Sequence, residues 1–154
     1  MSGETQLSIS IPTDDDGYIL LKCKHCGTFF KETVSDLQDD GVLNIFCPSC
    51  GLISDSYITD DVLELAMKMT RNLFNDMIYD TFKDFERHNK KNSMVKFKSG
   101  KKPRHEVEDP IRSGIETLEI STFPCCKRTA KIKPLLKMTG AYCPFCGVKN
   151  YEIE

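Results

Sequence analysis

The residues best suited to do chemistry in this 154-residue chain are its eight cysteines. They form three Cys-x-x-Cys pairs and one adjacent pair: Cys23 with Cys26, Cys47 with Cys50, Cys143 with Cys146, and Cys125 with Cys126. Such a set could form four disulfides or two four-ligand metal sites. Cys-x-x-Cys pairs in a chain without a secretory signal are typical of zinc ligands, because a reducing compartment keeps thiols free. The spacing therefore predicts two Zn²⁺ ions per chain.

Zinc bound in this way is not catalytic. Four thiolates fill the tetrahedral shell of the ion and leave no position for water, so both ions are expected to be structural. The three histidines, His25, His88 and His105, form no catalytic motif. A redox role for Cys125 and Cys126 is disfavoured because adjacent cysteines form a strained disulfide. The sequence therefore predicts a protein that is not an enzyme.

The cysteines belong to an internal repeat. Two offsets align its halves: at 96 residues Cys47 and Cys50 fall on Cys143 and Cys146, and at 100 residues Cys26 falls on Cys126. Cys23 then falls on Phe123, so the second half lacks a ligand at the expected position. We expect Cys125 to be the fourth ligand there, with His105 or no protein ligand as the alternatives. His25, inside the first Cys-x-x-Cys turn, is expected to be exposed and not a ligand.

The first module resembles the zinc-ribbon family, in which two knuckles on β-hairpins share one metal ion. The resemblance rests on Cys23-x2-Cys26-x20-Cys47-x2-Cys50 and covers residues 18–59 and, less completely, 118–154. It implies a three-stranded antiparallel ribbon around structural zinc, as in many nucleic-acid-processing and adaptor proteins.

The cysteine modules divide the chain into five segments. We predict an N-terminal strand or tail at 1–17, a first ribbon at 18–59, a central helix at 60–88, a basic linker at 89–113 and a second ribbon at 114–154. The linker is predicted from interruptions such as Asn92, Ser93, Gly100 and Pro103. The fold class is a small, metal-stabilised α+β protein with two antiparallel β zinc ribbons joined by a long central helix.

The central helix is predicted from its apolar periodicity. Thr59 can cap its first amides, and Asp60 and Asp61 suit the positive end of its dipole. Two adjacent apolar stripes follow, one at 62, 66, 69, 73 and 77 and the other at Leu63, Met67, Phe74, Ile78, Phe82 and Phe85. Together they are too wide for a simple surface helix, so we expect the second, more aromatic stripe to contact a protein partner or a second copy. The alternative is one compact monomer that buries both stripes.

Charge is distributed unevenly along the chain. Residues 1–64 contain twelve acidic and three basic side chains, whereas residues 87–105 contain eight Lys or Arg and no Asp or Glu. The possible nucleic-acid contacts in the basic segment are Lys90, Lys91, Lys96, Phe97, Lys98, Lys101, Lys102 and Arg104. The alternative is a solvated linker that pairs with the acidic half, in keeping with the overall pI of about 5.9.

Two functions remain open on these grounds. The first is a non-catalytic adaptor or assembly module that docks onto a larger protein complex. The second is direct, sequence-nonspecific nucleic-acid binding through residues 87–105 and the second ribbon. No apolar run approaches the roughly 20 residues that a membrane span needs. We expect an intracellular, cytoplasmic protein, with a nuclear location also open.

Overall fold

The computed structural model describes residues 4–91, 94, 96–112, 114 and 117–154. Asn92 and Ser93 of the predicted linker, and Ile115 and Glu116 of the predicted second ribbon, lie outside these residues. The chain divides into two units: Met1–Ile9 with Leu63–Pro110, called the helix unit, and Ser10–Val62 with Ile111–Glu154, called the ribbon unit. A 30-residue helix and two four-cysteine groups on antiparallel strands confirm the predicted α+β class.

Each half of the ribbon unit begins with a β-hairpin followed by a short helix. In the first half β1 (Tyr18–Lys22) pairs with β2 (Phe29–Thr33), and α1 (Val34–Leu37) follows. In the second half β3 (Glu119–Thr122) pairs with β4 (Thr129–Ile132), and α3 (Pro134–Thr139) follows. The second half then adds β5 (Ala141–Tyr142) and β6 (Lys149–Asn150), at the positions where the first half has an isolated bridge between Phe46 and Ile53.

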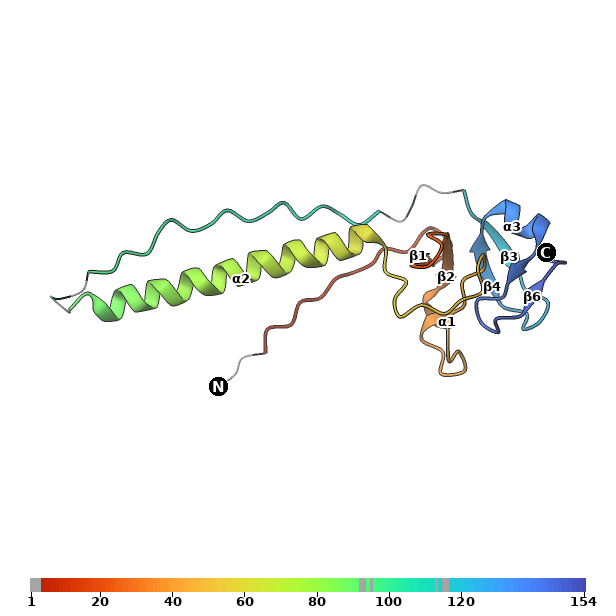
Figure 1. Cartoon of the computed structure of the whole chain (residues 1–154), viewed down its shortest axis with the longest axis horizontal. Helices are drawn as coiled ribbons and strands as arrows, with labels where there is room; N and C mark the ends of the chain where they lie inside the picture. The colour runs from red at the N-terminus through yellow and green to blue at the C-terminus, as the bar shows by residue number, and fades with distance from the viewer. Residues whose placement is uncertain (1–3, 92–93, 95, 113, 115–116) are drawn as a thin grey trace. The chain divides into compact units, whose positions relative to one another are not determined.

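The two hairpins form one sheet. Lys31 of β2 lies opposite Lys131 of β4 in an antiparallel pairing, which gives the strand order β1-β2-β4-β3 (Figure 1). The hydrophobic core is also shared, because Phe30 and Cys47 of the first half belong to the same buried cluster as Phe123 and Ile132 of the second. The sequence predicts two ribbons, but it does not predict that they complete each other's sheet and core.

Reciprocal contacts join the two halves at the Cys47–Cys50 and Cys143–Cys146 turns. The Phe46 amide donates to the Pro144 carbonyl (2.8 Å), and the Tyr142 amide donates to the Pro48 carbonyl (2.9 Å). The Tyr142 ring covers Gly51 and the Phe46 ring covers Gly147, so closely that a Cβ at either glycine would lie 2.8 Å from a ring carbon. Since these residues correspond at an offset of 96, the halves are related by an approximate two-fold axis.

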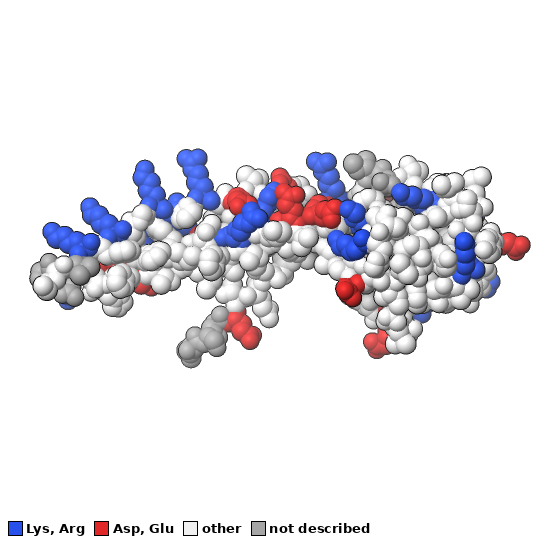
Figure 2. All heavy atoms as spheres, in the orientation of Figure 1, with Lys and Arg blue, Asp and Glu red and all other residues white. Residues whose placement is uncertain are grey.

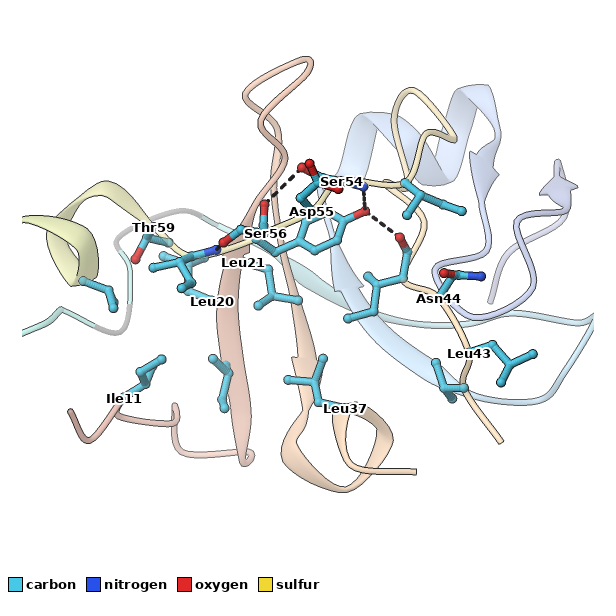
Figure 3. A pocket seen from close by; sticks show the side chains of 17 residues that line it. Ile11, Leu20, Leu21, Leu37, Leu43, Asn44, Ser54, Asp55, Ser56 and Thr59 are labelled. Atoms are coloured by element: carbon cyan, nitrogen blue, oxygen red, sulfur yellow. Dashed lines mark hydrogen bonds between the residues drawn. The ribbon is translucent and has the colours of Figure 1, made fainter. Parts of the chain in front are cut away.

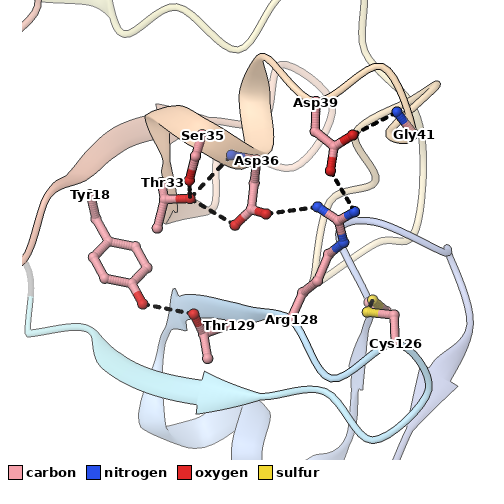
Figure 4. A network of polar contacts seen from close by, with 10 residues as sticks. Tyr18, Thr33, Ser35, Asp36, Asp39, Gly41, Cys126, Arg128 and Thr129 are labelled. Carbon is pink, nitrogen blue, oxygen red and sulfur yellow. Dashed lines mark hydrogen bonds and ion pairs between the residues drawn. The ribbon is translucent and has the colours of Figure 1, made fainter.

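Polar side chains reinforce the same junction (Figure 4). The guanidinium of Arg128 forms ion pairs with Asp36 and Asp39, each at 2.7 Å, and the Tyr18 and Thr129 hydroxyls lie 2.9 Å apart. These pairs span about 90 to 110 residues of sequence, so they join the first half of the unit to the second.

Two aspartates, Asp14 and Asp16, neutralise the two lysines at the centre of the sheet. Like charges directly opposite each other on neighbouring strands are destabilising. Asp14 lies 3.0 Å from the Lys31 ammonium and 2.8 Å from that of Lys131. Burial alone would raise the pKa of Asp14, but hydrogen bonds from Lys131, Tyr18 and Lys31 outweigh it and hold that pKa far below its usual range.

The helix unit contains most of α2 (Asp60–Asn89), which ends one residue beyond the predicted boundary, and an extended segment that runs back along it (Figure 1). We call residues 97–109 the strap. Its contacts with α2 run in reverse order: Phe97 stacks on Phe82 and Phe85, Lys102 and His105 pair with Asp76, Glu106 bonds to Asn72, and Asp109 pairs with Lys68. Asn72 is buried beneath the strap.

Candidate metal centres and the apolar face of the helix

The first metal centre is built on two backbone turns. In the first turn the Cys23 amide donates to the Thr28 carbonyl and the Gly27 amide donates to the Cys23 carbonyl, both at 2.9 Å. The second turn repeats this pattern between Cys47, Gly51 and Leu52. These bonds direct the four thiols of the module toward one point, so that all their sulfur atoms lie within 4.8 Å of one another.

The sulfur spacing fits a tetrahedral ion. Four thiolates about 2.3 Å from one Zn²⁺ place their sulfurs about 3.8 Å apart. The Cys23 and Cys50 sulfurs are 3.8 Å apart, and those of Cys26 and Cys47 are 3.5 Å apart. The Ser49 amide points at the Cys47 sulfur at 3.4 Å, a contact that disperses thiolate charge. This group could therefore hold a metal ion through four protein ligands.

The second centre reaches the same arrangement with one ligand moved. Phe123 occupies the backbone position of Cys23: its amide donates to the Arg128 carbonyl (3.0 Å), and its carbonyl accepts from Lys127 (2.8 Å). Cys125 supplies the missing sulfur, which lies within 4.8 Å of the sulfurs of the other three cysteines, Cys126, Cys143 and Cys146. The side-chain amide of Asn150 donates to the Cys125 sulfur at 3.5 Å. The structure thus groups Cys125, and not His105, with these three.

The protonation of the thiols depends on burial and on local donors. Burial raises the pKa of Cys47 and of Cys143 far above that of a free thiol. Burial also acts on Cys26, but hydrogen bonds from the Thr28 hydroxyl and amide outweigh it and lower the pKa of Cys26 to about 6. Binding a divalent cation at either group therefore releases protons from its buried thiols.

Neither four-sulfur group includes any of the three described histidines. His25 is exposed, and its Nε2 lies 3.0 Å from the Ile53 carbonyl oxygen. His88 contacts the Asp84 carbonyl within α2, and His105 pairs with Asp76. Each of them is engaged with oxygen atoms of its own unit.

The basic residues at 90–104 are mostly exposed. Lys102 pairs with Asp76 at 3.0 Å, and Phe97 is half-buried against α2, so these two are engaged within the helix unit. Among the described residues, Lys98, Lys101 and Arg104 form no ion pair, and Lys and Arg side chains stand out along this unit in the left half of Figure 2. Lys90, Lys91 and Lys96 line a shallow depression of about 380 Å³ beside Phe97.

The helix presents an apolar face that the strap touches only near its C-terminal end, where Phe97 stacks on Phe82 and Phe85. With about 100° of rotation per residue, the polar strap contacts at 68, 72 and 76 fall on one side of α2, and the predicted aromatic stripe falls largely on another. All members of that stripe are exposed, with exposed fractions from 37% to 61%. We call this set the apolar face: Leu63, Met67, Phe74, Ile78, Phe82 and Phe85. The other predicted stripe is less exposed, as its buried first member, Val62, illustrates.

A groove of about 480 Å³ crosses the first ribbon (Figure 3). Leu21, Leu37 and Leu43 are among its walls, and the Tyr57 hydroxyl bonds to the Ile45 carbonyl at one side. Burial raises the pKa of Tyr57 to about 12, so this hydroxyl stays protonated and donates. The groove contains no cysteine, and we assign it no chemistry.

The buried carboxyl group of Glu32 was not predicted from the sequence. Glu32 is fully buried in β2, and neither of its carboxylate oxygens has a hydrogen-bond partner within the described part of the chain. Burial, with a smaller contribution from the charge of Asp36, raises the pKa of Glu32 to about 8. The internal repeat indicates that Glu32 is buried, because Glu32 aligns at an offset of 100 with Ile132, which is also fully buried.

None of the helices in the described part of the chain combines the length and the apolar character that a membrane span requires. Comparison with known proteins identifies no relative: no protein-family model, no curated protein and no solved structure matches the chain. The two four-cysteine groups on β-hairpins are nevertheless consistent with zinc-binding modules.

Proposed function

We propose that this protein is a non-catalytic assembly module, in which two structural zinc ions hold the ribbon unit and the apolar face of α2 binds an amphipathic helix of another polypeptide. The exposure of that face is the observation that carries the proposal. Six large apolar side chains follow one side of a single helix, and all are exposed. Soluble proteins rarely leave so long an apolar row facing water unless another surface covers it.

The choice of zinc rests on ligand chemistry. Four thiolates in tetrahedral spacing select zinc or an iron–sulfur centre, and Cys-x-x-Cys turns on β-hairpins are typical of zinc. A complete protein shell leaves no site for substrate, which supports a structural role. Thiols in this number stay reduced in a cytoplasmic compartment, where we place the protein.

A photo-crosslinking residue tests the assembly role. With p-benzoylphenylalanine in place of Phe74, ultraviolet irradiation of the cells that make the protein should yield a covalent adduct with a polypeptide, and adding Ile78→Asp should abolish it. Zinc content, measured by elemental analysis, should stay at two per chain in both versions, since position 74 lies outside the sulfur groups. Failure to form any polypeptide adduct would reject the proposal.

Nucleic-acid binding remains a second candidate, supported by Lys98, Lys101 and Arg104 of the strap, which form no ion pair with any residue that the structure describes. Phosphate contacts of this kind make affinity fall steeply with salt. Labelled RNA and DNA should therefore bind more weakly to the triple variant Lys98→Ala, Lys101→Ala, Arg104→Ala. Binding that is absent at low salt, or equal in the variant, would remove this candidate.

A further inference from the structure

We infer that the helix bound by the apolar face is α2 of a second copy of the same chain, packed antiparallel, so that the protein is a homodimer. This inference rests on the proposed function and names the partner. Three observations carry it: the area of the face, its symmetry about Phe74, and the opposite charges at the two ends of α2.

The exposed area matches what a stable dimer needs. The side chains of the apolar face are 37% to 61% exposed, so that at about 200 Å² each they leave about 600 Å² facing water. The smaller stable interfaces bury about 600 Å² per partner, and standard ones about 800 Å². Met77, the exposed last member of the other stripe at 54%, lies beside the face and adds to this area. Two copies therefore cover each other without a further partner.

Three positions of the face, Leu63, Phe74 and Phe85, are placed symmetrically along α2. A two-fold interface pairs each residue i with j and also j with i, so it requires a surface that complements its own reversed copy. Leu63 and Phe85 lie eleven residues before and after Phe74. On antiparallel helices centred at Phe74, Leu63 of each chain meets Phe85 of the other, and the two Phe74 rings meet on the axis. The two Leu63–Phe85 contacts lie about 16 Å on either side of it.

Charge favours the antiparallel orientation. The first turn of α2 carries Asp60 and Asp61, and its last turn carries Arg87 and His88. Asp60 and His88 both lie fourteen residues from Phe74 and on the same side of the helix as the apolar face. Asp60 also pairs with Lys22 and Lys24 of its own chain, so the orientation rests mainly on the two helix dipoles, which antiparallel packing opposes. Parallel packing would instead bring like charges together at both ends.

Light scattering coupled to size exclusion, on the full-length zinc-bound protein, tests the dimer. From about 1 to 100 µM the wild type should approach twice the chain mass of 17.5 kDa. Phe74→Asp places a charge from each chain on the axis and should raise the dissociation constant at least about 30-fold. Met138→Asp makes a comparable change at a side chain that is 83% exposed outside the face, and it should leave the dimer intact.

Circular dichroism shows whether the Phe74→Asp variant keeps its helix. If the helix is lost, the milder variant Phe74→Ser is compared with wild type instead.

The orientation of the two helices is tested with p-benzoylphenylalanine at position 63 in a mixture of isotopically labelled and unlabelled chains. Antiparallel packing predicts cross-links to residues near 85 of the other chain, and cross-links near 63 would overturn it. A wild-type monomer at every concentration would overturn the dimer, yet an adduct from position 74 to a different polypeptide would leave the assembly role standing.

Discussion

The two halves of the ribbon unit build the same sulfur arrangement but differ at two equivalent positions. The first half has Cys23 where the second has Phe123, and the backbone bonds of the turn are the same around both. The turn therefore depends on main-chain bonds and not on the cysteine. Once the turn is fixed, a thiol two residues further along, at Cys125, reaches the same group. A sulfur can thus come from a different sequence position while the four-sulfur group is kept.

The second difference is in the core. Glu32 and Ile132 hold equivalent, fully buried positions on the two strands that join the halves. An isoleucine satisfies such a position by packing alone, whereas a carboxyl group without hydrogen-bond partners must stay protonated or lose stability. The repeat is therefore symmetric in its backbone but not in its response to pH.

The largest expected effect comes from removing the ligands that differ between the halves. Cys23→Ser and Cys125→Ser should each reduce the zinc content from two per chain to one, because each leaves three sulfurs at one centre. Structural zinc in such modules contributes about 10–16 kcal/mol in apparent terms, so without chelator either variant should unfold at much lower denaturant than the zinc-bound wild type. Elemental analysis and denaturant titration measure both effects.

The two centres are not equivalent if Cys23→Ser and Cys125→Ser differ in zinc content or stability. Two zinc ions and wild-type stability in Cys125→Ser would show that Cys125 is not a ligand, even though Cys23→Ser loses its ion. His105→Ala serves as the control, and it should keep both ions.

Glu32 should make the stability of the protein fall as pH rises. Its folded pKa of about 8 lies above the ordinary value of 4.5, so the stability is fully present below pH 4.5 and is lost as pH rises through 8. The loss between about pH 5 and pH 7 should be about 3 kcal/mol. Glu32→Gln is neutral at every pH and should lack this slope, whereas Ile132→Glu should acquire a similar one. Parallel free energies of unfolding for wild type and Glu32→Gln would contradict the buried carboxyl.

The reciprocal ring contacts predict a smaller effect at Gly147. Gly147→Ala places a methyl group 2.8 Å from the Phe46 ring at a φ of 73°, and it should cost about 2–3 kcal/mol. Gly27→Ala is the matched control, because Gly27 has the same φ of 73° but nothing within 4 Å of the added methyl. It should cost only about 1 kcal/mol. Equal losses from the two variants would show that the ring contact contributes nothing to the junction.

The smallest effect is expected at Lys127, the residue of the second half that corresponds to Gly27. Lys127 has a φ of 61°, in the left-handed region that glycine adopts without strain. Lys127→Gly should therefore stabilise the protein by up to about 1 kcal/mol and leave its zinc content unchanged. A loss of stability, measured by thermal unfolding, would show that the lysine side chain contributes more than its backbone strain costs.

Much of this architecture follows from sequence patterns of short range. The spacing of the cysteines predicts two groups of four, and the apolar periodicity predicts α2 to within one residue at its C-terminal end. The stripe that contains Leu63 and Phe74 is predicted to be the exposed one because it is the more aromatic, and its side chains are exposed. Whether Cys125 binds metal and what covers the stripe remain predictions.

Long-range features could not be predicted from those patterns. The pairing of Lys31 with Lys131 depends on Asp14, which lies outside either ribbon motif. The strap binds α2 through Asn72 and Asp76, two polar residues inside a helix whose apolar residues carry the visible pattern. Single polar contacts between distant segments leave no periodicity in a sequence.

The shared sheet has a consequence for how the protein forms during synthesis. Strand β2 is complete by Thr33, but its partner β4 begins only at Thr129, after α2 and the strap have been made. Because translation adds about 5–20 residues per second, the edge of β2 stays unpaired for several seconds or more before β4 is made. Early zinc capture by the first four cysteines would hold the nascent hairpin in place over that interval. With zinc bound in this way, the order of metal loading would follow the order of translation.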